Sequence, residues 1–397
     1  MAYNLKWGIL ATGGIATTFA KDLLTNPATR GVTDVSHTVA AAASSSSQAR
    51  AQEFLTSIKA PTSAKAYGSY HELVKDPDVD IIYVATPHSH HFQNCMLALE
   101  AGKHVLCEKA FTVNAEQARV LVKKAKEKGL FLMEAVWTRY FPLSIKIREV
   151  IQEGKIGDLV RVSSDNSFNL VGNPDAWGLG EAGDKNRMVN MDLAGGALLD
   201  LGIYSLTWVF QILYLCQKME DRERPKVLAA VDQYRTGADE MTSIICHFQK
   251  NRTMGVANTG LKVATQIAGE NSSSAGPACR IQGTKGEIQV TGPLYRPLKY
   301  KVILPGGKEE EVNCPIPKDP EREGADAEGW GHGMFWEADE AARCLRDGKK
   351  ESDTLTLEES VVIMETMDEV RKQGNIVYPE TIESTVYDEK SPLNGNN

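Results

Sequence analysis

The sequence contains seven cysteines in 397 residues, but no two of them have the C-x-x-C spacing. Because the seven are scattered and odd in number, we expect neither a structural zinc site nor a disulfide framework. Reduced thiols in a cytoplasmic protein fit this usage best. Residues 1–6 lead directly into a strand pattern, so we also expect no secretory leader.

The sequence also lacks a long apolar run and a basic block. Its best membrane candidate, residues 203–216, has only fourteen residues and includes Ser205, Thr207 and Gln211, so we expect no membrane span. There are 52 acidic and 44 basic residues, giving a net charge of −8, and nucleic acid is therefore not an expected partner. A hydrophobic content of 42% over this length predicts two ordinary folded domains.

The first strand–turn–helix pattern lacks one of its usual glycines. Residues 5–10 are typical of a buried strand and residues 15–24 of a helix. Dinucleotide-binding turns follow G-x-G-x-x-G or A, and an alanine stands at the first glycine. Small residues let the backbone approach a pyrophosphate, whose charge then meets the helix N-terminus. The candidate cofactor-binding residues of this turn are Ala11, Thr12, Gly13, Gly14 and Ile15.

No acidic residue follows the expected second strand, residues 37–43. An Asp or Glu at this point binds the ribose of NAD, whereas Arg and hydroxyl groups accommodate the 2′-phosphate of NADP. Four serines follow instead, with Arg50 one helical turn later. Ser45, Ser46 and Arg50 are therefore candidate ligands of a 2′-phosphate, which favours NADP. The alternative is that a serine only caps the next helix.

Two later strands, residues 80–85 and 103–107, are followed by polar residues. Ligands of open α/β sheets bind at the carboxyl ends of strands, so chemistry is expected there. The alternative is that these polar residues are only charged groups on the solvated surface. The histidines after the first of these strands do not share one face and lack a neighbouring carboxylate or cysteine, so we expect no metal. The candidate cofactor-binding residues at these two ends are Thr86, Pro87, His88, His91, Glu108 and Lys109.

A helix over 114–128, capped by Asn114, and a strand over 130–135 complete six expected β-α steps. We therefore predict a doubly wound parallel Rossmann domain over residues 1–142. Trp137 and Arg139 lie in the aromatic-rich segment that follows the last expected strand of this domain. They either face the cofactor or simply pack the domain junction.

Residues 143–390 are expected to form an α+β domain with a large, mostly antiparallel sheet. Asp200 and Tyr204 are four residues apart in an apolar helical stretch and share one face, which suits either catalysis or a structural hydrogen bond. A polar loop over 171–192 precedes them. We expect residues 391–397 to form a flexible tail. The expected strands and helices are 159–168, 226–235, 241–249, 253–261, 278–284, 287–291, 299–304, 335–345 and 355–371.

Four motifs in order resemble the glucose-fructose oxidoreductase / inositol dehydrogenase / rhizopine catabolism family. Two departures from the family pattern are Ala11, in place of the first glycine, and Ala110, in place of a proline. The motifs are residues 7–13, Thr86-Pro87 with His91, residues 102–109 and residues 196–204.

The resemblance implies NADP-dependent oxidation of D-xylose at C1 to D-xylonolactone. Lys109 and Tyr204 would form the acid–base pair, because a nearby ammonium favours the phenolate form of a tyrosine. Asp200 would orient Lys109 or the substrate hydroxyl. Substrate-lining candidates, from their position before the Asp200 helix, are Trp177, Arg187 and Asn190. The alternatives are a trans-1,2-dihydrodiol or another aldose as substrate, or a non-catalytic NAD(P)-binding regulator. Family members often pair through the antiparallel sheet, which implies a homodimer.

Overall fold

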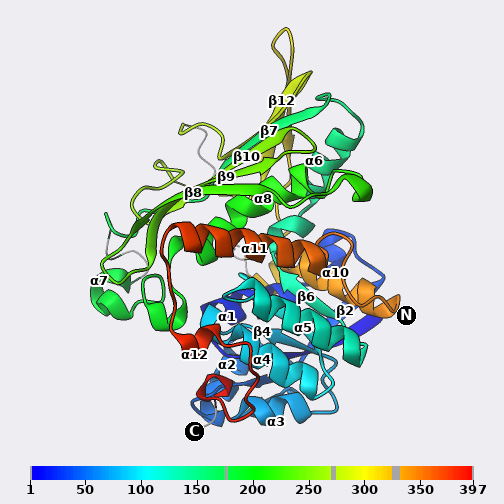
Figure 1. Cartoon of the computed structure of the whole chain (residues 1–397). Coiled ribbons are helices and arrows are strands. Elements are labelled where there is room, and N and C mark those ends of the chain that lie inside the picture. The colour runs from blue at the N-terminus through cyan, green and yellow to red at the C-terminus, as the bar shows by residue number, and fades with distance from the viewer. Residues whose placement is uncertain (1, 174, 176–177, 270–273, 324–330, 396–397) are drawn as a thin grey trace. The chain divides into compact units, whose positions relative to one another are not determined.

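The chain forms two compact units (Figure 1). The structure, a computed structural model, describes residues 2–173, 175, 178–269, 274–323 and 331–395. The first unit comprises Met1–Trp137, Ile316–Ser360 and Thr381–Asn397, and the second comprises Thr138–Pro315 and Val361–Glu380. This division differs from the expected continuous domain over 143–390, because two C-terminal segments return to the first unit.

The first unit contains a six-stranded parallel sheet in the order β3-β2-β1-β4-β5-β6. The strands are β1 (Tyr3–Leu10), β2 (Val35–Ala43), β3 (Lys65–Tyr67), β4 (Ile81–Val84), β5 (His104–Glu108) and β6 (Leu132–Ala135). The strand order reverses around β1, and ligands of such sheets bind at the carboxyl edge of this point. The predicted doubly wound sheet of six β-α steps is confirmed, although the pattern located only five of its strands and did not locate the three-residue β3.

Helices of the first unit form two groups. Helices α1 and α10 pack on each other and on β1 and β2, whereas α3 and α5 each contact α4. Asn114 caps α5 as predicted, since its side chain accepts a hydrogen bond from the Gln117 amide. The helices are α1 (Gly14–Leu23), η1 (Pro27–Arg30), α2 (Gln48–Ser57), α3 (Tyr70–Lys75), α4 (His88–Glu100), α5 (Ala115–Lys128), α9 (Pro320–Glu323), α10 (Phe335–Arg346) and η8 (Pro392–Asn394).

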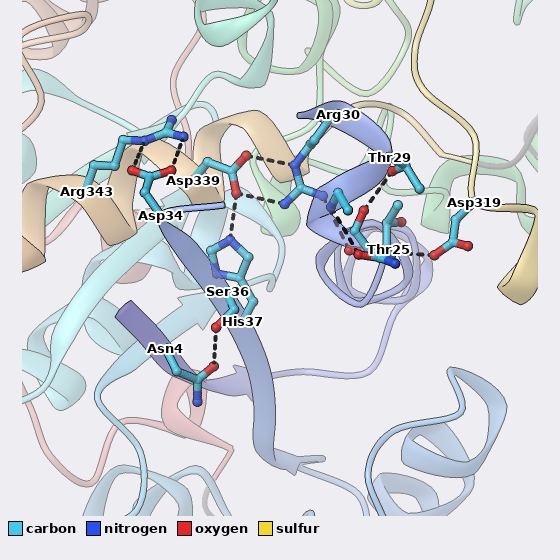
Figure 2. Close-up of polar contacts among 12 residues, drawn as sticks. Asn4, Thr25, Thr29, Arg30, Asp34, Ser36, His37, Asp319, Asp339 and Arg343 are labelled. Atoms are coloured by element: carbon cyan, nitrogen blue, oxygen red, sulfur yellow. Dashed lines mark hydrogen bonds and ion pairs between the residues drawn. The ribbon is translucent and has the colours of Figure 1, made fainter. Parts of the chain in front are cut away.

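A buried polar network fixes α10 to β2 and explains why residues 316–360 belong to the first unit (Figure 2). Arg30 donates two hydrogen bonds of 2.8 Å to the Asp339 carboxylate, and His37 Nε2 lies 2.9 Å from the same group. Trp7 Nε1 donates to His37 Nδ1 at 3.2 Å, so the proton of the neutral imidazole is on Nε2. Burial lowers the pKa of His37 and keeps it neutral.

The second unit contains an eight-stranded sheet in the order β14-β13-β12-β11-β7-β10-β9-β8. Only the β10–β7 pair is parallel among the neighbours described, so the prediction of a mostly antiparallel sheet is confirmed. The pattern did not predict β14. The strands are β7 (Leu159–Asp165), β8 (Lys226–Gln233), β9 (Asp239–Phe248), β10 (Thr253–Gly260), β11 (Cys279–Gly283), β12 (Gly286–Val290), β13 (Lys299–Leu304) and β14 (Lys308–Asn313).

The expected polar loop over 171–192 contains short helices and a hydrophobic cluster. Leu179, Met188 and Val189 are buried there together with Leu170 and Leu201. The helices of the second unit are α6 (Pro142–Gln152), α7 (Leu179–Ala182), η4 (Gly183–Lys185), η5 (Met191–Leu193), η6 (Leu198–Gly202), α8 (Ile203–Leu213) and η7 (Met219–Asp221).

Three of the described helices contain a point at which the chain passes from one unit to the other. They are η2 (Trp137–Tyr140), α11 (Leu357–Gln373) and α12 (Glu380–Glu383). The helical stretch Met191–Leu213 is long and apolar enough to span a membrane, but 94% of its most apolar window is buried inside the protein. It is longer than the run expected from the sequence, and this degree of burial is typical of a core helix.

Candidate active site

The turn after β1 leaves its helix N-terminus open. Gly13 is the N-cap of α1 and makes no side-chain cap, so the first amides of the helix have no capping side chain. Among the described residues, no atom lies within 4 Å of a Cβ built on Gly13 or Gly14. Both glycines are exposed, whereas Ala11, Thr12 and Ile15 are half-buried. This arrangement can accept the oxygens of a pyrophosphate.

Ala11 has a φ of +82°. This left-handed conformation favours glycine, and Ala11 holds the position at which the dinucleotide turn normally has one. The sequence therefore departs from the motif in side chain only, and the backbone of the turn keeps the shape of the motif.

The four serines after β2 have different partners and different exposure. Ser47 caps α2, because its hydroxyl accepts a hydrogen bond of 3.2 Å from the Arg50 amide. Ser44 is buried, with its hydroxyl 2.9 Å from that of Ser46. Ser46 and Arg50 are exposed and Ser45 is half-buried. The capping alternative thus holds for Ser47, while hydroxyl and guanidinium groups remain accessible beside it.

The residues after β4 are mostly turned into the protein. Thr86 donates a hydrogen bond of 2.8 Å to Asn94, and His88 and His91 are buried. His91 Nδ1 lies 2.9 Å from the Ala110 carbonyl oxygen and Nε2 lies 2.9 Å from the Thr86 carbonyl oxygen. Burial lowers the pKa of His91 to about 4, so the neutral ring carries one N–H and donates to only one of these two oxygens. The contact of His91 with a cofactor stays a prediction. Pro87 is exposed at this end.

At the end of β5, Glu108 and Lys109 differ in exposure. Glu108 is buried; its carboxylate accepts hydrogen bonds from the Tyr83 hydroxyl and from the Lys109 backbone amide, the latter at 3.1 Å. Glu108 thus has partners within the protein, and its contact with a cofactor stays a prediction. Lys109 is half-buried, and the Lys109–Ala110 peptide is cis although no proline follows.

A second buried carboxylate supports the segment after Lys109. Glu134 on β6 accepts a hydrogen bond of 3.0 Å from the Phe111 amide and one of 2.6 Å from the Ser360 hydroxyl. Two glutamates and the His91 ring thus hold the backbone on both sides of the lysine. Lys109 is consequently presented from a rigid strand end.

Glu337 on α10 is an unexpected ionisable group of the first unit. It is fully buried, and neither carboxyl oxygen has a hydrogen-bond partner among the described residues. Burial raises the pKa of Glu337 well above its usual value, and the negative charges of Glu108 and Asp22 raise it further. Burial therefore favours the neutral form of Glu337, which lies within electrostatic reach of the residue that precedes Lys109. No sequence signal distinguished it from a surface glutamate.

Trp137 and Arg139, which follow the last strand of the first sheet, are both buried. Trp137 is buried, with its ring centroid 5.8 Å from that of His332. Arg139 is fully buried, and its carbonyl oxygen accepts hydrogen bonds from Arg148. The packing alternative therefore holds for Arg139, because no part of it is accessible to a ligand.

In the second unit, Asp200 lies in the π-helix η6, which continues into α8. Its carboxylate pairs with Arg187 at 3.2 Å; the Asp200 side chain is 8% exposed and that of Arg187 is 49% exposed. The Asn190 side chain caps η5 by accepting a hydrogen bond of 2.9 Å from the Asp192 amide. Arg187 thus lies beside the candidate carboxylate, whereas Asn190 has a structural role. Trp177 lies outside the described residues.

Tyr204 opens α8 and lies in an aromatic cluster that the sequence did not predict. Its ring centroid is 5.9 Å from that of Tyr295, which in turn lies 6.0 Å from Phe168. Tyr204 is buried, whereas Phe168 and Tyr295 are half-buried. A phenol hydroxyl beside two partly exposed rings can bind a small substrate with both polar and apolar surface.

Asp239 at the start of β9 is a positioning residue that the sequence did not predict. It is fully buried and accepts hydrogen bonds from the Leu198 amide at 2.7 Å and the Thr242 hydroxyl at 3.1 Å. Gly196 has a φ of +130°, and a Cβ there would lie 2.0 Å from Asp239 Oδ1. A remote carboxylate thus caps the helix that carries Asp200 and Tyr204. Burial raises the pKa of Asp239 to about 6.

Comparison with known proteins agrees with these features. The chain matches an "Oxidoreductase family, NAD-binding Rossmann fold" over residues 5–136 and a "GFO/IDH/MocA C-terminal domain" over residues 144–289. It is 61% identical to D-xylose 1-dehydrogenase (NADP(+)) of Hypocrea jecorina, over 100% of this chain and 98% of that protein. It is 33% identical to trans-1,2-dihydrobenzene-1,2-diol dehydrogenase of Homo sapiens, over 95% and 98% of the two chains.

The fold is shared with solved structures of low sequence identity. An NAD-binding oxidoreductase from Klebsiella pneumoniae superimposes with a TM-score of 0.74 at 20% identity, over 95% of this chain and 100% of that one. The Rossmann sheet, the mixed eight-stranded sheet and the two family matches show that this chain belongs to the GFO/IDH/MocA oxidoreductase family.

Proposed function

We propose that this protein oxidises D-xylose at C1 with NADP⁺, giving D-xylonolactone and NADPH. The observation that carries the proposal is the 61% identity, over the full chain, to a D-xylose 1-dehydrogenase that uses NADP⁺. Family membership supports the reaction class, which is hydride transfer between a hydroxyl-bearing carbon and a nicotinamide.

The residues at the carboxyl edge of the first sheet fit NADP. The uncapped N-terminus of α1 and the open space around Gly13 and Gly14 suit the pyrophosphate. Ser46 and Arg50 are exposed after β2, where NAD-specific chains carry an acid. Residues 11–15 would hold the pyrophosphate, and Ser45, Ser46 and Arg50 would hold the 2′-phosphate. When bound, NADP⁺ supplies the hydride acceptor.

The remaining chemistry is a proton transfer, for which the chain has suitable groups. Oxidation at C1 removes a hydride from the carbon and a proton from its hydroxyl. Tyr204 would accept that proton, and the Lys109 ammonium would stabilise the negative charge that develops on the oxygen. Asp200, paired with Arg187, would hold a second hydroxyl of the sugar.

A trans-dihydrodiol is a second candidate substrate, for which the aromatic cluster is the specific observation. The Tyr204, Tyr295 and Phe168 rings lie within 6.0 Å of their neighbours and could pack against an unsaturated six-membered ring. The 33% identity to trans-1,2-dihydrobenzene-1,2-diol dehydrogenase points the same way.

A steady-state panel distinguishes these substrates and the non-catalytic alternative. Pentoses, hexoses and a trans-1,2-dihydrodiol are each measured with NADP⁺ and with NAD⁺. We expect the highest kcat/KM for D-xylose with NADP⁺. A higher value for the dihydrodiol would replace the sugar assignment. Binding of NADPH without turnover of any of them would instead favour a regulator.

We further propose a homodimer that pairs through the outer face of the second sheet. Leu228, Ile245, Met241 and Met254 are exposed on β8, β9 and β10, and Leu228 lies directly opposite Ile245. A large apolar patch on a sheet face suits association with a second copy. Ile245→Lys should shift the sedimentation coefficient from dimer to monomer, and a wild-type monomer at micromolar concentration would contradict the proposal.

A cytoplasmic location is also proposed, supported by the seven cysteines, all of which are described and unbridged. Cell fractionation with a tagged full-length chain tests it, and recovery in a secreted or vesicular fraction would contradict it.

A further inference from the structure

The C-terminal residues are firmly packed on the first unit, where the sequence predicted a flexible tail. Asn394 is fully buried, and its side-chain amide donates to the Asp388 carbonyl oxygen at 3.1 Å. Ser391 caps the short helix η8 by accepting a hydrogen bond of 3.3 Å from the Leu393 amide. The tail over residues 391–395 is therefore an ordered part of the nucleotide-binding unit.

Side-chain amides on two helices hold the chain that leads to this tail. Gln117 on α5 donates to the carbonyl oxygens of Ile382 and Ser384 at 2.8 and 2.9 Å. Gln93 on α4 donates to the Val386 carbonyl oxygen at 2.8 Å and accepts from the Asp388 amide at 3.0 Å. The segment is thus bound along its length by helices of the same unit.

The tail ends beside the two strand ends that flank the dinucleotide turn. Asn94 donates to the Leu393 carbonyl oxygen at 2.9 Å and to Asn394 Oδ1 at 3.1 Å. The same Asn94 accepts the hydrogen bond from Thr86, directly after β4. At the other side, Gly395 approaches Ser45, after β2: a Cβ on Gly395 would lie 2.7 Å from Ser45 Cβ.

The approach to Ser45 requires glycine for two reasons. Gly395 has a φ of +67°, which L side chains rarely adopt, and an added Cβ would also lie 3.1 Å from the Tyr70 ring. Tyr70 is buried, and an interaction with Ser45 favours its ionised form. The tail, Tyr70 and the β2–α2 turn therefore form one packed group.

We propose that residues 391–395 form a wall of the adenosine end of the cofactor site and fix Ser45 and Thr86 in their binding positions. The proposal rests on the proposed NADP-dependent function. Its physical basis is pre-organisation: a turn that is already held when the ligand arrives loses less conformational entropy on binding. The chemical group recognised at this end is an adenosine 2′-phosphate, carried by NADP but not by NAD.

The test measures binding of 2′,5′-ADP, which contains only the adenosine end of the cofactor, by calorimetry. A chain ending at Lys390 should bind it at least tenfold more weakly than the wild type, while a chain ending at Gly395 should bind it normally. Gly395→Ala, which disturbs only the contact with Ser45 and Tyr70, should weaken binding at least threefold. This single substitution keeps the test decisive if the shorter chain does not fold.

A matched control separates a local effect from general loosening. Gln93→Ala removes two hydrogen bonds to the same C-terminal segment, but at Val386 and Asp388. It should lower Tm without changing the 2′,5′-ADP affinity, whereas Gly395→Ala should lower the affinity. Equal affinities in wild type and Gly395→Ala would overturn the proposal, as would equal losses in Gly395→Ala and Gln93→Ala.

The outcome for the wild-type chain separates this inference from the function on which it rests. If the wild type binds 2′,5′-ADP and the variants do so equally well, only the role of the tail is overturned. If the wild type binds neither 2′,5′-ADP nor NADPH, the proposed cofactor is overturned and the tail proposal with it.

Discussion

Lys109 and Tyr204 are held in place in different ways. Lys109 follows a central parallel strand, and its backbone neighbours are fixed by buried groups: the Glu108 carboxylate and the His91 ring. Tyr204 lies at the start of a helix whose first amide is capped by Asp239, a residue some forty positions away. The first site residue thus depends on its own sheet, and the second depends on one remote carboxylate.

The difference teaches to which conditions the surroundings of each residue are sensitive. Asp200, close to Tyr204, pairs with an Arg187 side chain that is 49% exposed, and exposed ion pairs weaken as salt rises. The groups around Lys109 are buried, and buried interactions are screened much less by salt. We therefore expect ionic strength to alter the surroundings of Asp200 and Tyr204 more than those of Lys109.

The largest expected effect comes from removing the reacting groups themselves. Lys109→Met and Tyr204→Phe should each lower kcat by about 100-fold or more, the scale of an acid–base group. NADPH affinity should stay near the wild-type value in both, which fluorescence titration checks. Unchanged turnover in both variants would remove the acid–base assignment.

The second prediction concerns the remote cap. Asp239→Ala should lower the free energy of unfolding by about 2 kcal/mol, because it removes a helix cap and leaves the buried Leu198 amide unpaired. Asp239→Asn, the matched control, keeps an acceptor oxygen and should retain most of that stability in urea unfolding. Equal losses in the two variants would contradict a stabilising hydrogen bond from the Leu198 amide.

The same residue gives a pH prediction. The folded-state pKa of Asp239, about 6, lies above its ordinary value, so ionisation costs stability. The contribution of the neutral carboxyl is complete at low pH and is lost as the pH rises through 6. The Tm of Asp239→Asn relative to that of the wild type should therefore increase between pH 5 and pH 8. A constant difference across this range would contradict the assignment.

Glu337 provides a pH test for the surroundings of Lys109, as Asp239 does for those of Tyr204. Burial raises the pKa of Glu337 well above its ordinary value. The stability of the wild type should therefore fall as the pH rises above the pKa of an ordinary glutamate. Glu337→Gln mimics the neutral form and should match wild type near pH 4 but be more stable at pH 9, as judged by urea unfolding. The reverse order at pH 9 would indicate an ionised Glu337.

The smallest expected effect is at the dinucleotide turn. Ala11→Gly relieves a left-handed alanine but adds freedom to the unfolded chain, so the free energy of unfolding should rise by only about 0.5 kcal/mol. Thermal unfolding measures the change. A clear loss of stability would show that the alanine methyl group contributes packing that outweighs its backbone strain.

Most of the fold follows from hydrophobic pattern, and the strands that were missed show its limit. The apolar runs in β1, β4 and β5 are central strands and were predicted. β3 has three residues and lies at a sheet edge, and β14 is the charged edge sequence KEEEVN. Edge strands carry charge and are often very short, which discourages aggregation and also removes the alternating pattern by which strands are recognised.

The candidate site shows a second limit. Residue type and spacing identified the strand ends that carry Glu108, Lys109 and His91, but not the direction of each side chain. Glu108 and His91 turn inward because buried backbone groups beside them need hydrogen-bond partners. Asp239 and the C-terminal tail were missed because their partners are 41 and about 300 residues away, beyond any local pattern.

The network of Arg30, His37 and Asp339 has a consequence for biosynthesis (Figure 2). The nucleotide-binding unit begins at the first residue, yet its α10 helix and its last segment are translated after nearly all of the second unit. While the ribosome is still working, Asp339 is absent, and the Arg30 and His37 side chains and the apolar surface that α10 covers have no native partner. The nascent protein therefore completes its N-terminal unit last, which is the reverse of the usual order of domain-wise cotranslational folding.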